Sequence, residues 1–106
     1  MAFVDNYDWL VDIPEGWVLL ARNMLDEIKV VNPSFEVTDM KEKWGMLRVY
    51  GWYEDEETEA IIRKYEKLSS FTCCHCGMPA TKLSTGWILP WCDRCGIDDE
   101  KYYKRL

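Results

Sequence analysis

Four of the five cysteines form two C-x-x-C pairs, a pattern whose chemistry is metal binding through thiolates. A glycine follows each pair directly, and 15 residues separate the pairs, which consist of Cys73, Cys76, Cys92 and Cys95. Two thiolates separated by two residues can reach one ion from a single tight turn. Gly77 and Gly96 permit the positive φ that turns backbone amides towards the sulfurs. The spacing therefore predicts one zinc ion held by four sulfurs.

A closed shell of four cysteines leaves no coordination position for water or substrate, so the predicted zinc is structural rather than catalytic. A redox motif is the alternative, but a thioredoxin-type pair sits in a strand–helix unit, and here two matching pairs are present. Cys74 and His75 lie inside the first pair and are also good zinc donors. We expect neither to bind, because the two pairs already complete the set, although either one can replace a neighbouring ligand.

The segment between the pairs predicts a small β-hairpin that positions the two metal-binding turns. A turn over 84–86 separates two short strand-like runs within residues 80–90. Residues 97–106 mix charged and aromatic side chains and favour a terminal helix. With that helix the module is a treble-clef zinc finger, which we expect; without it the module is a zinc ribbon.

The residues before the cysteines predict a helix that begins near Asp12 and ends before Pro33. Asp12, Pro14 and Glu15 have the acceptor, early proline and third-position carboxylate of a capping box. The apolar residues that follow recur at helical spacing and predict a core-facing side made of Trp17, Leu20, Ala21, Met24, Leu25 and Ile28. Proline pushes the preceding residue out of the helical region, which ends the helix.

A β-hairpin and a second helix are expected next. Alternating apolar and polar residues predict strands over 34–40 and 46–53, joined by a turn over 41–45. The acidic run from Asp55 suits the positive end of a helix dipole, and apolar residues recur at helical spacing over 56–68. The predicted fold class is therefore α+β, with a helix, a β-hairpin and a helix before the zinc module.

Length and charge divide the chain into two parts that we expect to pack as one compact unit. The 106 residues fit one domain, and the 48% hydrophobic content is that of a globular protein. Residues 1–69 hold 15 acidic and 8 basic side chains, whereas 70–106 hold 4 acidic and 5 basic ones. We expect an acidic α+β part over 1–69 and a zinc module over 70–106.

The first residues lack the features of an export signal. Residues 1–10 contain two acidic side chains, no basic one and no long apolar run. No stretch approaches the roughly 18 uninterrupted apolar residues that a membrane-spanning helix requires. We expect a cytoplasmic protein that does not bind a membrane, and in that compartment cysteine pairs indicate metal or redox chemistry more often than disulfides.

Basic and aromatic side chains over 41–52 form the candidate partner-binding surface, which consists of Lys41, Lys43, Trp44, Arg48 and Trp52. Solvated charges around packed aromatic residues are the simpler interpretation of this segment. The net charge of −6 opposes binding to a phosphate backbone, so we expect a protein partner. The alternative is a nucleic-acid-binding regulator that uses Lys82, Arg94, Lys101, Lys104 and Arg105.

The sequence offers few groups for catalysis. Its only histidine lies inside the first cysteine pair, and it has no phosphate-binding glycine loop and no G-x-S-x-G nucleophile motif. The carboxylates over 54–59 are explained by the start of a helix. We therefore expect a binding protein without catalytic residues.

The segment KEKWGMLRVY over 41–50, followed by a helix and the two cysteine pairs, resembles a group of small uncharacterised bacterial and phage zinc-binding proteins. These carry K-E-K-aromatic-G-x-L-R-aromatic-Y before C-x-x-C-G and a second metal-binding pair, and the resemblance runs from about Glu15 to Cys95. The chain departs from the group at Val49, where an aromatic is expected, and at the additional Cys74. The resemblance implies the same architecture and a phage or mobile-element accessory protein that inhibits a host factor.

Overall fold

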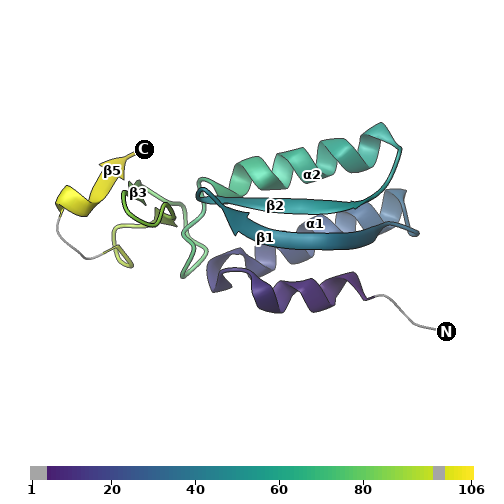
Figure 1. Cartoon of the computed structure of the whole chain (residues 1–106), viewed down its shortest axis with the longest axis horizontal. Helices are drawn as coiled ribbons and strands as arrows, with labels where there is room; N and C mark the ends of the chain where they lie inside the picture. The colour runs from purple at the N-terminus through teal and green to yellow at the C-terminus, as the bar shows by residue number, and fades with distance from the viewer. Residues whose placement is uncertain (1–4, 97–99) are drawn as a thin grey trace.

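The computed structural model describes residues 5–96 and 100–106 and has the predicted α+β fold (Figure 1). Two helices, α1 (Val18–Val31) and α2 (Glu56–Ser69), pack beside a hairpin of β1 (Glu36–Lys43) and β2 (Met46–Trp52). The molecule is elongated, with extents of 50 × 26 × 20 Å, and the cysteine-rich segment forms one end. In the part of the chain that the structure describes, no helix is long and apolar enough to cross a bilayer.

The first helix begins later than the sequence predicts, and the prediction of a capping box at Asp12 is wrong. Asp12 is the last residue of the 3-10 helix η1 (Asn6–Asp12), which is capped by the Asp5 side chain. Pro14 is extended, with φ −53° and ψ 140°, so the turn that a capping box requires does not form there. A second 3-10 helix, η2 (Glu15–Trp17), leads into α1 instead.

The apolar side of α1 lies in the core as predicted, except that Leu20 is only half-buried. Trp17, just before the helix, has no exposed surface. Residues of the hairpin, of the segment just before it and of α2 complete the core, which beyond α1 includes Phe35, Val37, Met40, Leu47, Val49 and Ile62. The helix ends at Val31, before Pro33 as predicted, because proline disfavours helical geometry in the residue before it.

The hairpin turn is tighter than the sequence pattern suggests. The first strand extends to Lys43 instead of ending at Met40, so only Trp44 and Gly45 separate the two strands. Both turn residues have positive φ, 56° for Trp44 and 81° for Gly45. Positive φ at both central residues is the signature of a type I′ turn, whose twist matches that of the strands it joins.

Side chains from the neighbouring helices accept hydrogen bonds from backbone amides on both strands of the hairpin. On β2, the Leu47 amide donates a hydrogen bond to Oγ of Ser69 (2.8 Å), and the Val49 amide donates to Oε2 of Glu66 (3.0 Å). On β1, an asparagine oxygen of η1 accepts a hydrogen bond from the Val37 amide (2.9 Å). A two-stranded hairpin is marginally stable alone and its edges invite pairing, so these contacts hold it in the fold.

The second helix begins at Glu56 as predicted, because Asp55 caps it. The Asp55 carboxylate accepts hydrogen bonds from the amide (2.9 Å) and the hydroxyl (2.6 Å) of Thr58, and these bonds lower the pKa of the carboxyl below its ordinary value. It also accepts a hydrogen bond from the side chain of Asn32 (2.9 Å). The start of α2 is thereby fixed to the end of α1.

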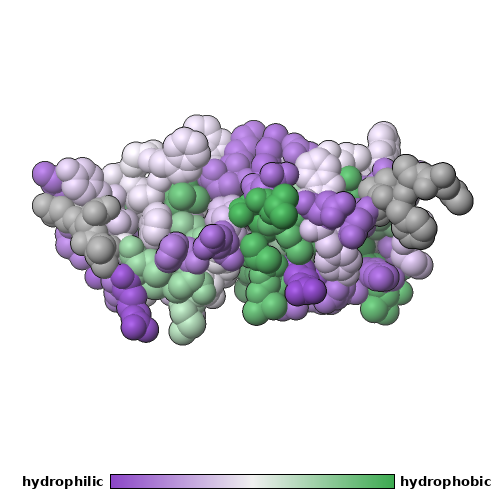
Figure 2. All heavy atoms as spheres, turned by 90° about the horizontal axis from the view of Figure 1, so that it is seen from below, coloured by the Kyte–Doolittle hydropathy of each residue, from purple (hydrophilic) through white to green (hydrophobic). Residues whose placement is uncertain are grey.

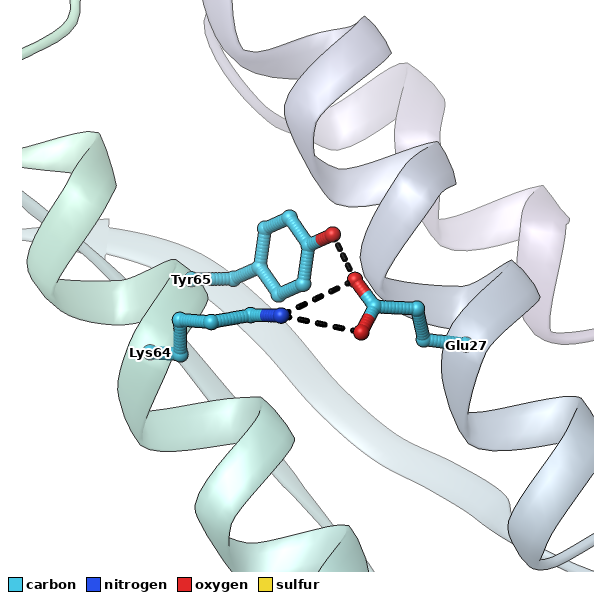
Figure 3. Close-up of polar contacts among 3 residues, drawn as sticks. All are labelled: Glu27, Lys64 and Tyr65. Carbon is cyan, nitrogen blue, oxygen red and sulfur yellow. Dashed lines mark hydrogen bonds and ion pairs between the residues drawn. The ribbon is translucent and has the colours of Figure 1, made fainter.

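A polar cluster of Glu27, Lys64 and Tyr65 joins the two helices along their length (Figure 3). Nζ of Lys64 lies 2.9 and 3.2 Å from the two carboxylate oxygens of Glu27, and the Tyr65 hydroxyl donates to the same carboxylate. The charged side chains are about half exposed, so we expect the ion pair to contribute at most about 1 kcal/mol. The cluster links α1 to α2 outside the hydrophobic core.

The cysteine-rich segment contains a small antiparallel sheet in the order β4-β3-β5. The predicted hairpin is present as β3 (Lys82–Ser84) and β4 (Pro90–Trp91). The predicted terminal helix is wrong for residues 100–106, which form the 3-10 helix η3 (Glu100–Tyr102) and the strand β5 (Tyr103–Arg105). Residues 97–99, the start of that prediction, lie outside the described residues.

The free edge of β3 explains why the chain ends in a strand. Once β4 covers one edge, β5 pairs along the other, and the ammonium of Lys82 lies 4.3 Å from the centre of the Tyr103 ring. Aromatic residues such as Tyr103 also favour strands. The treble clef is therefore not confirmed, and the three-stranded sheet resembles the ribbon alternative.

The division of the chain into an acidic part and a cysteine-rich part between residues 69 and 70 stays a prediction. The helix α2 ends at this boundary, but Cys74, which lies beyond it, belongs to the main core.

Replacing Ser69 with alanine tests the contact between α2 and the hairpin edge. Ser69 is fully buried, and its loss leaves the buried Leu47 amide without an acceptor, which costs about 1–3 kcal/mol. We expect S69A to lower the free energy of unfolding by this amount in urea titrations. S70A is the matched control, because that hydroxyl makes only an exposed bond within the helix end, and it should change stability by less than about 0.5 kcal/mol.

Candidate metal centre

The structure brings the four cysteines of the two C-x-x-C pairs to one point. Among the described residues their sulfur atoms all lie within 4.8 Å of one another, and the cluster consists of Cys73, Cys76, Cys92 and Cys95. Cys73 and Cys92 are buried, Cys95 is half-buried and Cys76 is exposed. The four side chains are close enough to coordinate a single metal ion.

The spacing of the sulfurs fits a tetrahedral ion. With zinc–sulfur bonds of about 2.3 Å, the sulfurs of a regular tetrahedron lie roughly 3.8 Å apart. Sγ of Cys76 and Sγ of Cys92 are 3.6 Å apart, close to that edge and far longer than the roughly 2.05 Å of a disulfide bond. The cysteines are free thiols, and soft thiolate donors in this arrangement suit zinc.

Backbone hydrogen bonds shape the first cysteine turn. The Cys73 amide donates to the carbonyl oxygen of Met78 (2.7 Å), and the Gly77 amide donates to that of Cys73 (3.0 Å). Gly77 has a φ of 83°, as the sequence predicts, which a side chain would disfavour. An isolated bridge between Thr72 and Pro79 closes the base of the turn.

The second cysteine turn uses its glycine for a different reason. The Gly96 amide donates to the Cys92 carbonyl oxygen (2.9 Å), but Gly96 is not among the residues with positive φ. A Cβ at this position would lie 2.7 Å from the Lys82 side chain and 3.0 Å from Cβ of Trp91. The prediction of a positive φ is correct for Gly77 and wrong for Gly96. At Gly96, glycine is needed because β3 and β4 lie too close for a side chain.

The thiol pKa values show how the sulfurs affect one another. Desolvation opposes ionisation of Cys92, but hydrogen bonds from the Cys95 amide and from neighbouring thiols outweigh it and lower the pKa of Cys92 to about 7. Desolvation and the bond that it donates to Cys92 raise the pKa of Cys95 to about 12. The pKa of Cys73 is also lowered, whereas that of Cys76 is raised. Cys76 and Cys95 therefore need a cation to compensate the charge of their thiolates.

Cys74 and His75 lie outside the sulfur cluster. Cys74 points into the hydrophobic core, and its burial raises the pKa of the thiol to about 12, so it stays protonated and unreactive. His75 is exposed at the surface of the first turn. Neither residue is needed to complete a set of four sulfur ligands.

The first cysteine turn packs directly on the start of α1, a contact that the sequence did not reveal. The Gly16 amide donates to the Cys74 carbonyl oxygen (2.8 Å), and a Cβ on Gly16 would lie 2.0 Å from the Cys73 carbonyl oxygen. Nε1 of Trp17 donates to the Thr72 carbonyl oxygen (2.9 Å). Only glycine allows the two backbones to approach so closely. The sequence feature that could have indicated this contact is a glycine directly before a tryptophan at a helix start.

The structure does not bring all five residues of the candidate partner-binding surface together. Lys41, Lys43, Arg48 and Trp52 alternate with buried residues along the strands and lie on the outer face of the hairpin. Trp44 lies at the hairpin turn, where the indole is 74% exposed. The candidate partner-binding surface predicted from the sequence did not include Trp87 or Glu42, which line a groove together with Trp44.

Removing single cysteines tests the ligand set. We expect native mass spectrometry to find one zinc per chain in the wild type and in C74A, because Cys74 lies outside the sulfur cluster. C95S should lose the zinc and, by circular dichroism, the structure of the C-terminal third, since metal binding supplies its folding energy. Retention of zinc in C95S, or its loss in C74A, would show that the ligand set is different.

Proton release tests the charge state of the cysteines. The pKa of Cys95 is raised to about 12 and that of Cys76 is also raised, so both of these thiols carry protons in the metal-free protein at pH 7. We expect zinc binding to release at least about two protons, measured by calorimetry in buffers of different ionisation enthalpy. Zinc affinity should therefore fall as the pH is lowered; an affinity that is constant from about pH 6 to 8 would contradict this.

Comparisons with protein-family models, with curated proteins and with solved structures found no match for this chain. Its function is therefore inferred from the side chains themselves. They include four cysteines that can hold a metal ion, and a surface with several exposed aromatic and aliphatic residues.

Proposed function

We propose that the chain is a zinc-stabilised domain that binds a protein partner and carries out no chemistry of its own. The four sulfurs complete a coordination shell, so a zinc ion held by them has no position for substrate. With the metal in a structural role, function rests on the surface. The observation that carries the proposal is an apolar groove beside the metal centre.

This groove lies where α1, α2 and the first cysteine turn meet. It has a volume of about 490 Å³, and Leu19, Leu68 and Met78 line it next to Cys76. These three apolar side chains are largely exposed, with 68%, 46% and 61% of their surface open to solvent. Figure 2 shows that hydrophobic side chains also gather near the middle of the face that carries η1. Apolar surface of this kind is typical of protein interaction sites.

Binding of nucleic acid is the alternative, and the arrangement of the basic residues counts against it. Lys82 is buried, and Arg105 is paired with Asp93 (2.8 Å) and Glu100 (3.6 Å). Of the five basic residues proposed for this role, Arg94 and Lys104 are exposed and have no ion pair among the described residues. With a net charge of −6, little positive potential remains to attract phosphates.

The resemblance to bacterial and phage zinc proteins suggests where to look for the partner. Small acidic proteins of phages and mobile elements often act by occupying a surface of a host protein. We therefore propose a bacterial host factor as the partner, a proposal supported by the acidic charge and by the resemblance over residues 41–50.

Affinity capture from a bacterial lysate, with zinc present and nucleases added, tests partner binding. We expect a specific protein to be retained by the wild type and by V30K, because Val30 is 83% exposed on α1 but does not line the groove beside the metal. L19K and M78K should reduce the capture at least about tenfold, since a lysine head group cannot be desolvated there. Capture of no specific protein would count against the proposal.

Salt dependence separates the two candidate functions. Binding carried by phosphate contacts falls steeply between about 50 and 200 mM salt, whereas binding through an apolar groove changes little. We expect the captured protein to remain bound over this range. A nucleic acid that binds at the lower concentration and dissociates at the higher one would instead support the alternative function.

A further inference from the structure

The turns of the two hairpins lie against each other, although more than 40 residues separate them in the chain. A Cβ on Gly45 would be 3.1 Å from Cγ2 of Ile88, so the first turn is in van der Waals contact with the loop before β4. Between them lies a groove of about 280 Å³, the tryptophan groove, which is lined by Glu42, Trp44, Gly86, Trp87 and Ile88.

Both tryptophans of this groove are unusually exposed. Trp44 is 74% and Trp87 is 75% exposed, so neither contributes its ring to the core. Indole is the best side-chain surface for cation–π binding, and two indoles on one groove offer more such surface than an isolated ring. The groove is smaller than the roughly 300–1,000 Å³ of sites for drug-sized ligands, so its size suits a single side chain.

The backbone at Trp44 is a second, independent observation. Trp44 is the only non-glycine among the described residues with positive φ (56°), a conformation that is an outlier for a bulky side chain. Glycine, asparagine or aspartate would occupy this turn position with less strain. Neither hairpin stability nor core packing explains a tryptophan here, whereas a contact made by its exposed ring does.

Glu42 gives the tryptophan groove its charge. Its side chain is half-buried on the inner face of β1, and Oε1 accepts a hydrogen bond from the Gly45 amide (2.9 Å), which holds the carboxylate beside Trp44. The neighbouring lysine, Lys43, projects from the opposite face of the strand and does not line the groove. A carboxylate that lines a groove together with two indoles favours a cation over a neutral or anionic group.

We propose that the tryptophan groove receives an arginine or lysine side chain from a basic peptide segment of the partner. This inference rests on the proposed function and states which chemistry the partner presents. The net charge of −6 attracts such a segment over a distance, and Glu42, Trp44 and Trp87 then bind one cationic side chain. A proline-rich or purely apolar segment also stacks on indoles, but it does not need the carboxylate.

Peptide titration of the zinc-loaded full chain tests this proposal. The probe is acetyl-Gly-Arg-Gly-Arg-Gly-amide, followed through the six tryptophan indole N–H signals in nitrogen–proton NMR spectra. We expect the signals of Trp44 and Trp87 to shift and that of Trp17, which is fully buried in the core, to stay in place. The same peptide with citrulline in place of arginine keeps the shape but lacks the charge, and it should bind at least about fivefold more weakly.

Three variants identify the groups responsible. W87A removes one indole. W44G removes the other while retaining a residue that adopts positive φ without strain, and E42Q keeps an oxygen for the Gly45 amide but removes the charge. Each should weaken binding of the arginine peptide at least about fivefold. F71A is the control, because Phe71 is an exposed aromatic residue (51%) that does not line the groove, and it should bind like the wild type.

Equal binding of the arginine and citrulline peptides, or unchanged binding in E42Q, overturns the assignment of a cation site. Preferential binding of a proline-rich peptide would also overturn it. A captured partner that W44G and W87A still bind as tightly as the wild type refutes this inference and leaves the proposed function standing. Failure to capture any specific protein refutes the proposed function itself.

Discussion

Four sulfur atoms held within 4.8 Å of one another are the constraint on which the C-terminal third of the chain depends. Thiolates at this distance repel one another. Desolvation and hydrogen bonding to the neighbouring sulfurs raise the pKa of Cys95 to about 12, whereas hydrogen bonds from the Cys95 amide and from neighbouring thiols lower that of Cys92 to about 7. A divalent cation removes this conflict, and zinc binding contributes on the order of 10 kcal/mol to folding in small zinc domains. Strands of only two or three residues cannot supply that energy through their own packing.

The metal centre also affects the rest of the molecule, because the first cysteine turn is built into the main core. Its backbone bonds to Gly16 on one side and, through the Cys74 amide, to the Pro90 carbonyl oxygen of β4 (2.9 Å) on the other. The loop before β4 then meets the hairpin turn at Gly45. Both candidate binding grooves lie at this junction, so the order of the metal site and the shape of the grooves are linked.

Local patterns predicted the elements well and their ends less well. Helical spacing and the Asp55 cap located α2, since both depend on neighbouring residues only. The capping box at Asp12 was wrong because Pro14 is extended, and the terminal helix was wrong because β3 offers an unpaired edge to the last residues. The hairpin turn was placed too broadly, because few tryptophans adopt the positive φ of Trp44.

The sequence by itself determined the α+β class, the core side of α1 and the four cysteines, because spacing along the chain specifies which side chains share a face or one turn. Tertiary structure alone decided what meets across the chain: Gly16 against the first cysteine turn, and Trp44 beside Trp87. These pairs are separated by more than 40 residues, and no local pattern encodes their contact. They arise only when the cysteine-rich segment packs on the helices and the hairpin, so the surfaces proposed for binding were visible only in the folded molecule.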